Sequence, residues 1–130
     1  MAEATQLPTH VEGMVPILNV GNVMDSVRYY VDVLGFKLDW DAPAYASVSL
    51  DGHAIMLCQG GQGHSGTWIW IGVENVEALF NYYVGRGAKI QQELTNYSWA
   101  YEMRIEDPDG HVLRFGSEPR TDLPLESGNS

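Results

Sequence analysis

The sequence reads Asn22-Val23-Met24-Asp25-Ser26-Val27-Arg28-Tyr29-Tyr30-Val31, and fifty-three positions further on it reads Asn75-Val76-Glu77-Ala78-Leu79-Phe80-Asn81-Tyr82-Tyr83-Val84. Both stretches begin with Asn-Val and end with Tyr-Tyr-Val. A second repeat, Asp-Gly-His, occurs at 51–53 and again at 109–111. Its larger offset, fifty-eight positions, is what a short insertion in one copy produces. A repeat present only twice favours a domain with pseudo-twofold symmetry over a solenoid or propeller, and it predicts a site between the halves.

Each copy has the apolar spacing of an amphipathic helix. Asn22 is the expected N-cap of the first helix and Gly35 its expected end, because Asn caps N-termini and Gly ends helices. Asn75 is the corresponding cap of the second helix, which is expected to end near Gly85 and Gly87. The two apolar stripes consist of Val23, Val27, Tyr30, Val31 and Leu34, and of Val76, Phe80, Tyr83 and Val84.

The strands expected around these helices alternate between two faces. One face carries the β-branched and aliphatic side chains that pack against the helices, such as Leu18, Ile55 and Ile71. The opposite face mixes aromatic, thioether, hydroxyl and charged groups, which is typical of the wall of a ligand cleft. Its members are Val15, Ile17, Asn19, Tyr45, Ser47, Ser49, Ala54, Met56, Cys58, Trp68, Trp70, Glu102, Arg104, Val112 and Arg114.

Length and composition limit the class of protein. The 130 residues are enough for one domain with its own core. The single cysteine, Cys58, and the absence of a basic and apolar leader at Met1 predict a cytoplasmic protein, and no apolar run approaches the length of a membrane span. The net charge of −10 opposes binding to nucleic acid. It either favours a cationic partner or serves solubility alone.

The expected organisation is a leader at 1–13, a single domain at 14–118 and a loose polar tail at 119–130. Within the domain, the first module covers 14–59 and the second 67–118. The connector between them, 60–66, is rich in glycine and is expected to let the modules separate.

A strand, a helix and three strands, repeated twice, resemble the vicinal oxygen chelate superfamily over Met14 to Glu118. The residues that carry the resemblance are the opening Val15-Pro16-Ile17-Leu18 and the turn Asp107-Pro108-Asp109-Gly110. The resemblance implies an α+β fold, in which two pseudo-symmetric βαββ or βαβββ modules form a curved mixed sheet around a cleft. This is the glyoxalase/bleomycin-resistance fold.

Enzymes of this superfamily place metal ligands, usually His and Glu, on the first and last strands of each half. The matching positions here are Val15, Met56, Trp68 and Arg114, none of which suits a divalent metal. The resemblance therefore implies no metal, no cofactor and no catalytic residue at the usual site.

The histidines lie elsewhere in the sequence. His53 and His111 follow Asp-Gly in matching turns, so both are expected to be exposed. A metal site assembled from His10, Glu12 and His64 stays open as an alternative.

Within the superfamily, the chain most resembles the bleomycin-resistance proteins, which have an acidic balance and the Val-Pro-x-Leu opening. They also have a helix that ends in Leu-Gly-Phe, here Leu34-Gly35-Phe36. In those proteins the drug lies between two subunits against aromatic rings. Trp99 shares that face only if its strand begins after it, and each ring has core filling as an alternative role. The expected ligand-binding residues are Trp40, Tyr45, Ser47, Met56, Trp68, Trp99, Glu102 and Arg114.

Pro16 lies in the first strand, where bleomycin-resistance proteins exchange that strand between subunits. The resemblance thus predicts a strand-swapped homodimer, and an ordinary edge strand is the alternative.

The favoured function is a non-catalytic binder that sequesters a planar, cationic glycopeptide antibiotic of the bleomycin type. The first alternative is a glyoxalase-, lyase- or dioxygenase-like enzyme of the same superfamily, acting on a small metabolite. Its only cleft-facing carboxylate by alternation is Glu102, which either pairs with Arg104 and Arg114 or selects a different ligand. A small-metabolite sensor or accessory subunit is the third hypothesis.

Overall fold

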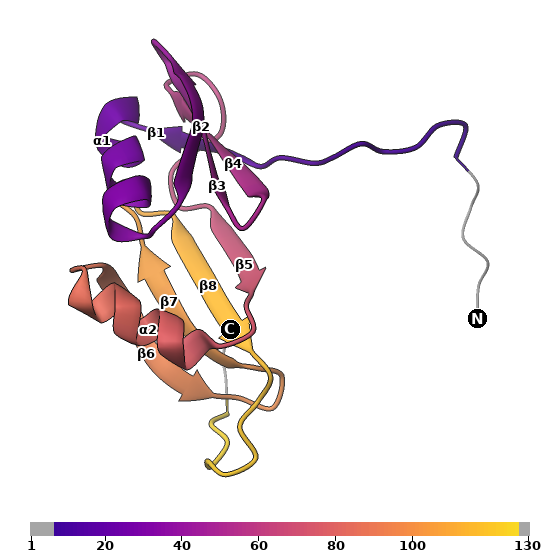
Figure 1. Ribbon diagram of the computed structural model, residues 1–130, viewed down its shortest axis with the longest axis vertical. Helices are drawn as coiled ribbons and strands as arrows, with labels where there is room; N and C mark the ends of the chain where they lie inside the picture. The colour runs from indigo at the N-terminus through magenta and orange to yellow at the C-terminus, as the bar shows by residue number, and fades with distance from the viewer. Residues whose placement is uncertain (1–6, 128–130) are drawn as a thin grey trace.

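The computed structural model describes residues 7–127, and its strands form two four-stranded sheets (Figure 1). Sheet A has the order β1-β4-β3-β2, and sheet B has the order β5-β8-β7-β6. In each sheet the first strand of the module pairs in parallel with the last, and the other pairs are antiparallel. The predicted α+β fold of two repeated modules is thereby confirmed. The elements of the first module are β1 (Ile17–Val20), α1 (Val23–Arg28), β2 (Lys37–Ala42), β3 (Tyr45–Leu50) and β4 (His53–Gln59). Those of the second are β5 (Trp68–Gly72), α2 (Val76–Gly85), β6 (Lys89–Asn96), β7 (Tyr101–Glu106) and β8 (Val112–Ser117).

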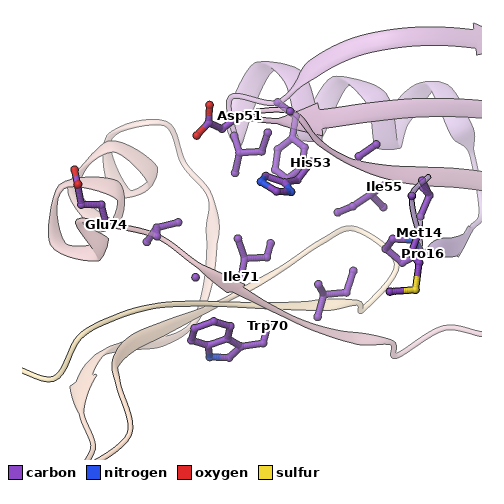
Figure 2. Close-up of a pocket in the computed structure, with 17 residues that line it drawn as sticks. Met14, Pro16, Asp51, His53, Ile55, Trp70, Ile71 and Glu74 are labelled. Carbon is purple, nitrogen blue, oxygen red and sulfur yellow. The ribbon is translucent and has the colours of Figure 1, made fainter. Parts of the chain in front are cut away.

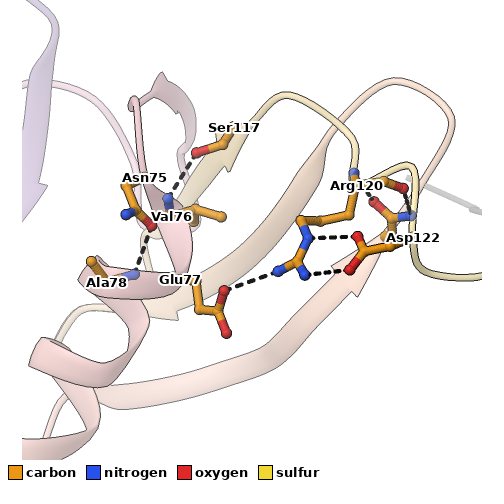
Figure 3. Close-up of polar contacts among 8 residues, drawn as sticks. Asn75, Val76, Glu77, Ala78, Ser117, Arg120 and Asp122 are labelled. Carbon is orange, nitrogen blue, oxygen red and sulfur yellow. Dashed lines mark hydrogen bonds and ion pairs between the residues drawn. The ribbon is translucent and has the colours of Figure 1, made fainter.

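Both predicted helix caps are present. The Asn22 side chain accepts a hydrogen bond from the Asp25 backbone N–H at 2.9 Å, and α1 continues into a π-helical turn, Tyr29–Val33. The Asn75 side chain accepts from the Ala78 N–H at 3.0 Å (Figure 3). Each bond satisfies a backbone donor that has no partner within the helix.

Each helix packs on its own sheet, and the two modules share one hydrophobic core. The repeated tyrosines Tyr30 and Tyr83 are fully buried and meet Phe36 and Phe115 edge-on. Burying an apolar side chain of this size stabilises the fold by about 1.5–3 kcal/mol. Because the core is continuous, the two modules pack against each other and are not independent units.

His111 lies at the joint between the modules. It is 0% exposed, so the expectation of an exposed turn is wrong for His111, although His53 is exposed. Its Nδ1 accepts a hydrogen bond from the Thr67 N–H at 3.0 Å, which leaves Nε2 to donate to the Asn19 carbonyl at 2.6 Å. One imidazole thus ties β1 to the start of β5 and to β8.

The acidic residues of the same turn strengthen this joint. Asp109 accepts from the Gly21 N–H at 2.8 Å and from the Ser26 hydroxyl at 3.2 Å, both in the first module. Asp107 accepts from the Tyr30 hydroxyl at 2.9 Å and is almost fully buried. Burial is the main cause that raises the pKa of the Asp107 carboxyl. The turn that carries part of the sequence resemblance therefore joins the two modules.

The connector is also held in place. Gln62 donates a hydrogen bond to the Tyr45 hydroxyl, and Gly63 packs beside the backbone of Ile17 and Asn19 in β1. Glycine at 63 has a φ of 75°, a conformation that other residues rarely adopt. The connector therefore lies along the free edge of β1 and is held against the first module.

The segment after β8 differs from the expected loose tail over its described part. Asn96 donates to the carbonyls of Arg120 and Leu123, and Arg120 pairs with Glu77 at 3.0 Å and with Asp122 (Figure 3). The segment after β8 has no regular secondary structure, but these contacts bind it to β6 and α2. Residues 1–6 of the expected leader and 128–130 of the tail lie outside the described residues.

The described part of the leader, residues 7–13, is exposed throughout, and toward its N-terminus the chain extends away from both modules (Figure 1). The β1 strand that follows pairs with β4 of its own chain, and the Met56 N–H donates to the Pro16 carbonyl at 2.9 Å. No helix within residues 7–127 has the length and apolar character needed to cross a membrane.

Candidate functional site

The face of each sheet that points away from the helices carries the predicted site residues. On sheet B, strand register places Trp70, Arg114 and Arg104 side by side on β5, β8 and β7. Trp68 lies on the same face, two positions before Trp70. The exposed fractions are 48% for Trp68, 52% for Trp70 and 46% for Trp99, so this face presents three half-exposed indoles. We call it the open face of sheet B.

Trp99 reaches this face because β7 begins only at Tyr101. The turn before the strand leaves the indole free to point toward Glu102, and Nε1 donates to Oε1 at 2.7 Å. The Tyr97 ring stacks on Trp99 with a centroid separation of 4.5 Å and an interplanar angle of 4°. Trp99 is thereby held from one side by a ring and from its edge by a carboxylate.

Glu102 is fully buried and holds Arg114 as well as Trp99. Arg114 Nε donates to Oε2 at 2.9 Å, and Nη2 donates to Oε1 at 3.1 Å. This bidentate pairing raises the pKa of Arg114 above its ordinary value. Because both carboxylate oxygens have these partners and the side chain is fully buried, Glu102 orients the groups around it.

Arg104 stands beside this pair with its guanidinium 5.0 Å from the centre of the Trp68 ring. This is a cation–π distance. The face therefore alternates aromatic rings with guanidinium groups, an arrangement suited to flat ligands that stack.

Trp70 lies over glycine backbone. A Cβ at Gly72 would come within 2.8 Å of the indole, and one at Gly116 within 3.0 Å. Both positions need glycine, because a side chain would prevent this close approach. The glycines therefore set the position of the ring.

The open face of sheet A carries a second row: Trp40, Ser47, Met56 and Ile17 lie in register across its four strands. A β-bulge between Leu38 and Trp40 also turns Asp39 to this face. The Asp39 carboxylate accepts from the hydroxyls of Ser47 at 3.1 Å and Ser49 at 2.8 Å. Strict alternation missed Asp39, because the sequence has no signal for the bulge.

Tyr45 lies next to this row and pairs in register with Cys58. The neighbouring Cys58 thiol is the main cause that raises the pKa of the Tyr45 hydroxyl. The connector residue Gln62 meets the same hydroxyl. Tyr45 therefore marks the border between the open face of sheet A and the connector.

The structure divides the eight predicted residues into two groups. Trp40, Tyr45, Ser47 and Met56 are on sheet A. Trp68, Glu102 and Arg114 are on sheet B, and Trp99 lies in the turn before β7. Within residues 7–127, no hydrogen bond, ion pair or ring contact joins one group to the other. Ser47 and Glu102 are buried beneath their neighbours, whereas Trp40 and Trp68 are half exposed.

The positions that would hold a metal do not fit one. Val15 and Met56 offer no oxygen or nitrogen donor, the indole of Trp68 is a donor group only, and Arg114 is already paired with Glu102. Over residues 7–127, no three His, Cys, Asp or Glu side chains are grouped to hold a metal ion, so His10, Glu12 and His64 form no such set.

A cavity of about 780 Å³ lies between the modules, where the repeat predicts a site. Figure 2 shows Ile55, Ile71 and His53 directed into it, with Asp51 and Glu74 at one end and Met14 and Pro16 at the other. The Trp70 indole points to the opposite side of its strand. The cavity is lined by none of the eight predicted residues, although Trp70, Val15 and Ala54 contribute to its lining.

Solved structures of other proteins have the same fold. The crystal structure of TioX from Micromonospora sp. ML1 superposes with a TM-score of 0.73 at 23% identity, covering 83% of this chain and 99% of TioX. The bleomycin-binding protein from Streptomyces verticillus, complexed with copper(II)-bleomycin, gives a TM-score of 0.72 at 21% identity, covering 86% of this chain and 99% of that protein. At these identities the likeness concerns the fold.

A third structure, a glyoxalase/bleomycin resistance protein/dioxygenase from Nocardioides, gives a TM-score of 0.69 at 15% identity, with 93% of each chain covered. Among curated proteins, no sequence matches the chain at a significant level. The family model of the Glyoxalase/Bleomycin resistance protein/Dioxygenase superfamily matches residues 8–115. The chain therefore belongs to the glyoxalase/bleomycin resistance protein/dioxygenase superfamily.

Proposed function

We propose that this protein is a metal-free binder of the bleomycin-resistance type, which sequesters a planar, cationic glycopeptide antibiotic without transforming it. The observation that carries the proposal is the exposure of four tryptophans, Trp40, Trp68, Trp70 and Trp99, each between 46% and 52%. Indoles on an open sheet face offer flat apolar area, which stacks on flat heterocycles. Such exposed apolar surface on a folded domain marks a binding site.

The proposed site is completed at the interface of a homodimer. The open faces of sheets A and B carry its two halves, and within residues 7–127 no hydrogen bond, ion pair or ring contact joins these halves. Placing sheet A of one copy opposite sheet B of another brings Trp40 toward Trp68 and Trp99. If β1 is exchanged between copies, it makes the same parallel pairing with β4 of the partner copy.

The charge distribution favours a cationic ligand for this cleft. The chain has a net charge of −10, and Asp39 adds a carboxylate beside Trp40 on the open face of sheet A. A negative protein field attracts cations, and aromatic faces bind them. The enzyme alternative depends on Glu102 as an acid or base, and that carboxylate is buried in contacts with Trp99 and Arg114.

Equilibrium dialysis against copper-bound and metal-free bleomycin at low ionic strength tests the proposal, with mass spectrometry of the recovered drug. We expect saturable binding and unchanged drug, and an affinity about tenfold lower in Trp68→Ala, because one stacking surface is lost. Met24→Ala, which removes an exposed side chain from α1, is the control and should bind as the native protein does. Chemically altered drug would favour the enzyme alternative, and no binding would exclude drugs of this type.

A further inference from the structure

Arg104 has no anionic partner in the part of the chain that the structure describes. Its Nε and Nη2 atoms are buried and make no hydrogen bond within residues 7–127. No carboxylate oxygen within residues 7–127 lies within ion-pair distance of its guanidinium. The chain has 17 acidic residues against 7 basic ones, so the missing partner does not reflect a shortage of carboxylates. A buried donor left unpaired is unfavourable, and a buried unpaired charge more so.

The neighbouring arginine shows what these donors are suited to hold. Arg114, the register partner of Arg104 on β8, uses its own Nε and Nη2 to hold both oxygens of Glu102, at 2.9 and 3.1 Å. These two atoms form one edge of the planar guanidinium, whose geometry matches a carboxylate or phosphate. Arg104 presents the same edge on the neighbouring strand β7, where neither atom has a hydrogen-bond partner among the described residues.

The Trp68 ring lies against the guanidinium of Arg104. The ring centre is 5.0 Å from the guanidinium, and Trp68 is itself 48% exposed. A half-exposed indole on an edge strand has room to change rotamer, and turning it aside uncovers the guanidinium to the open face. An entering aromatic ligand that stacks on Trp68 is then placed beside the unpaired donors.

We propose that Arg104 receives an anionic group of the bound ligand, a carboxylate or similar oxyanion attached to a flat ring system. The inference rests on the proposed function, because it lies on the same open face of sheet B. It narrows the ligand class to planar molecules that carry an acidic group in addition to the cationic part favoured by the acidic chain. Arg104 is then the residue that selects for that group.

The probes are 2-naphthoate and 2-naphthamide, which have the same ring system and differ in charge. Calorimetric titration of the full chain should show about tenfold tighter binding of the naphthoate, since hydrogen bonds between ionised groups are the stronger kind. Arg104→Gln should abolish this preference. Arg28→Gln makes the same change in net charge at an exposed site on α1 and should retain it. Equal affinity for both probes in the native protein, or a preference unchanged in Arg104→Gln, overturns the inference.

Two measurements distinguish a ligand anion from a partner within the protein. Urea unfolding of Arg104→Gln should give a midpoint equal to or above that of the native protein, because the substitution removes an unpaired buried charge. If light scattering instead shows that Arg104→Gln weakens a dimer and neither probe is preferred, an acidic side chain of a second copy is the partner and the inference is overturned.

Titration of the same samples with copper-bleomycin distinguishes the two proposals. Drug binding without a naphthoate preference leaves the proposed function standing and overturns the role of Arg104. A naphthoate preference without drug binding supports the role of Arg104 and excludes a bleomycin-type ligand. Binding of none of the three compounds overturns both.

Discussion

Trp99 donates its indole N–H to the fully buried carboxylate of Glu102, at 2.7 Å. The same carboxylate holds Arg114 at 2.9 and 3.1 Å. One acidic side chain beneath the open face thus sets the positions of an indole and a guanidinium on top of it. The indole and the guanidinium on this face therefore depend on a residue that is itself fully buried.

Replacing Glu102 should therefore disturb both stability and binding. Glu102→Ala leaves the mostly buried guanidinium of Arg114 without its counter-charge, which we expect to cost about 3 kcal/mol in the free energy of unfolding measured in urea. Arg28→Ala, which removes an exposed ion pair with Asp25, should cost only about 0.5 kcal/mol. Similar losses in the two variants would contradict the role assigned to this network.

The repeated tyrosines provide a matched pair. The Tyr30 hydroxyl donates to Asp107 at 2.9 Å, whereas the equally buried Tyr83 hydroxyl has no hydrogen-bond partner among the described residues. Tyr30→Phe should destabilise the fold by about 1–3 kcal/mol, because it leaves a buried carboxylate short of a donor. Tyr83→Phe removes an unsatisfied hydroxyl and should be neutral or stabilising. Thermal unfolding of both variants checks the order, and a larger loss in Tyr83→Phe would show that the assignment is wrong.

Asp107 should affect how stability depends on pH. Burial raises its pKa in the folded state above the ordinary value of 3.8, so the folded chain binds this proton more tightly than the unfolded chain. Stability contributed by this group is then greatest in acid and falls as pH rises from about 3.8 through the folded pKa. The difference in unfolding free energy between native protein and Asp107→Asn, measured in urea from acid to neutral pH, should shrink in that direction. A difference that grows with pH would contradict this prediction.

The glycine beneath Trp70 should matter for binding more than for folding. Gly72→Ala introduces a Cβ 2.8 Å from the indole, which must move. Because Trp70 is half exposed, it has room to shift, and we expect a loss of stability on the order of 1 kcal/mol with a clear loss of ligand affinity. Gly13→Ala, with open space around it, serves as the control in the same titration. Undiminished affinity in Gly72→Ala would remove Trp70 from the site.

Much of the fold follows from patterns that depend on local spacing. The Asn22 and Asn75 caps and the helix-facing strand residues were predictable because capping and alternation act within a few residues. His111 was not, because Asp-Gly-His reads the same in both copies while only the second copy meets the other module. Whether a turn is exposed depends on contacts across the chain.

The candidate site shows the same division. Trp68 and Arg114 were placed on the open face by alternation alone. Asp39 was missed because a β-bulge changes the face of one residue without any mark in the sequence. The pairing of Glu102 with Trp99 also could not be predicted from the sequence, because it depends on the turn that precedes β7. Local patterns therefore find the face, and tertiary packing decides which residues on it are free.

Tryptophan fluorescence during titration with copper-bleomycin tests the central claim most directly, because the proposed site contains all four tryptophans. We expect saturable quenching at about one drug per chain with an affinity in the micromolar range or tighter. Quenching should be reduced in Trp68→Phe and Trp99→Phe. Fluorescence that does not change, at drug concentrations far above the micromolar range, would contradict the claim that the open faces bind a drug of this type.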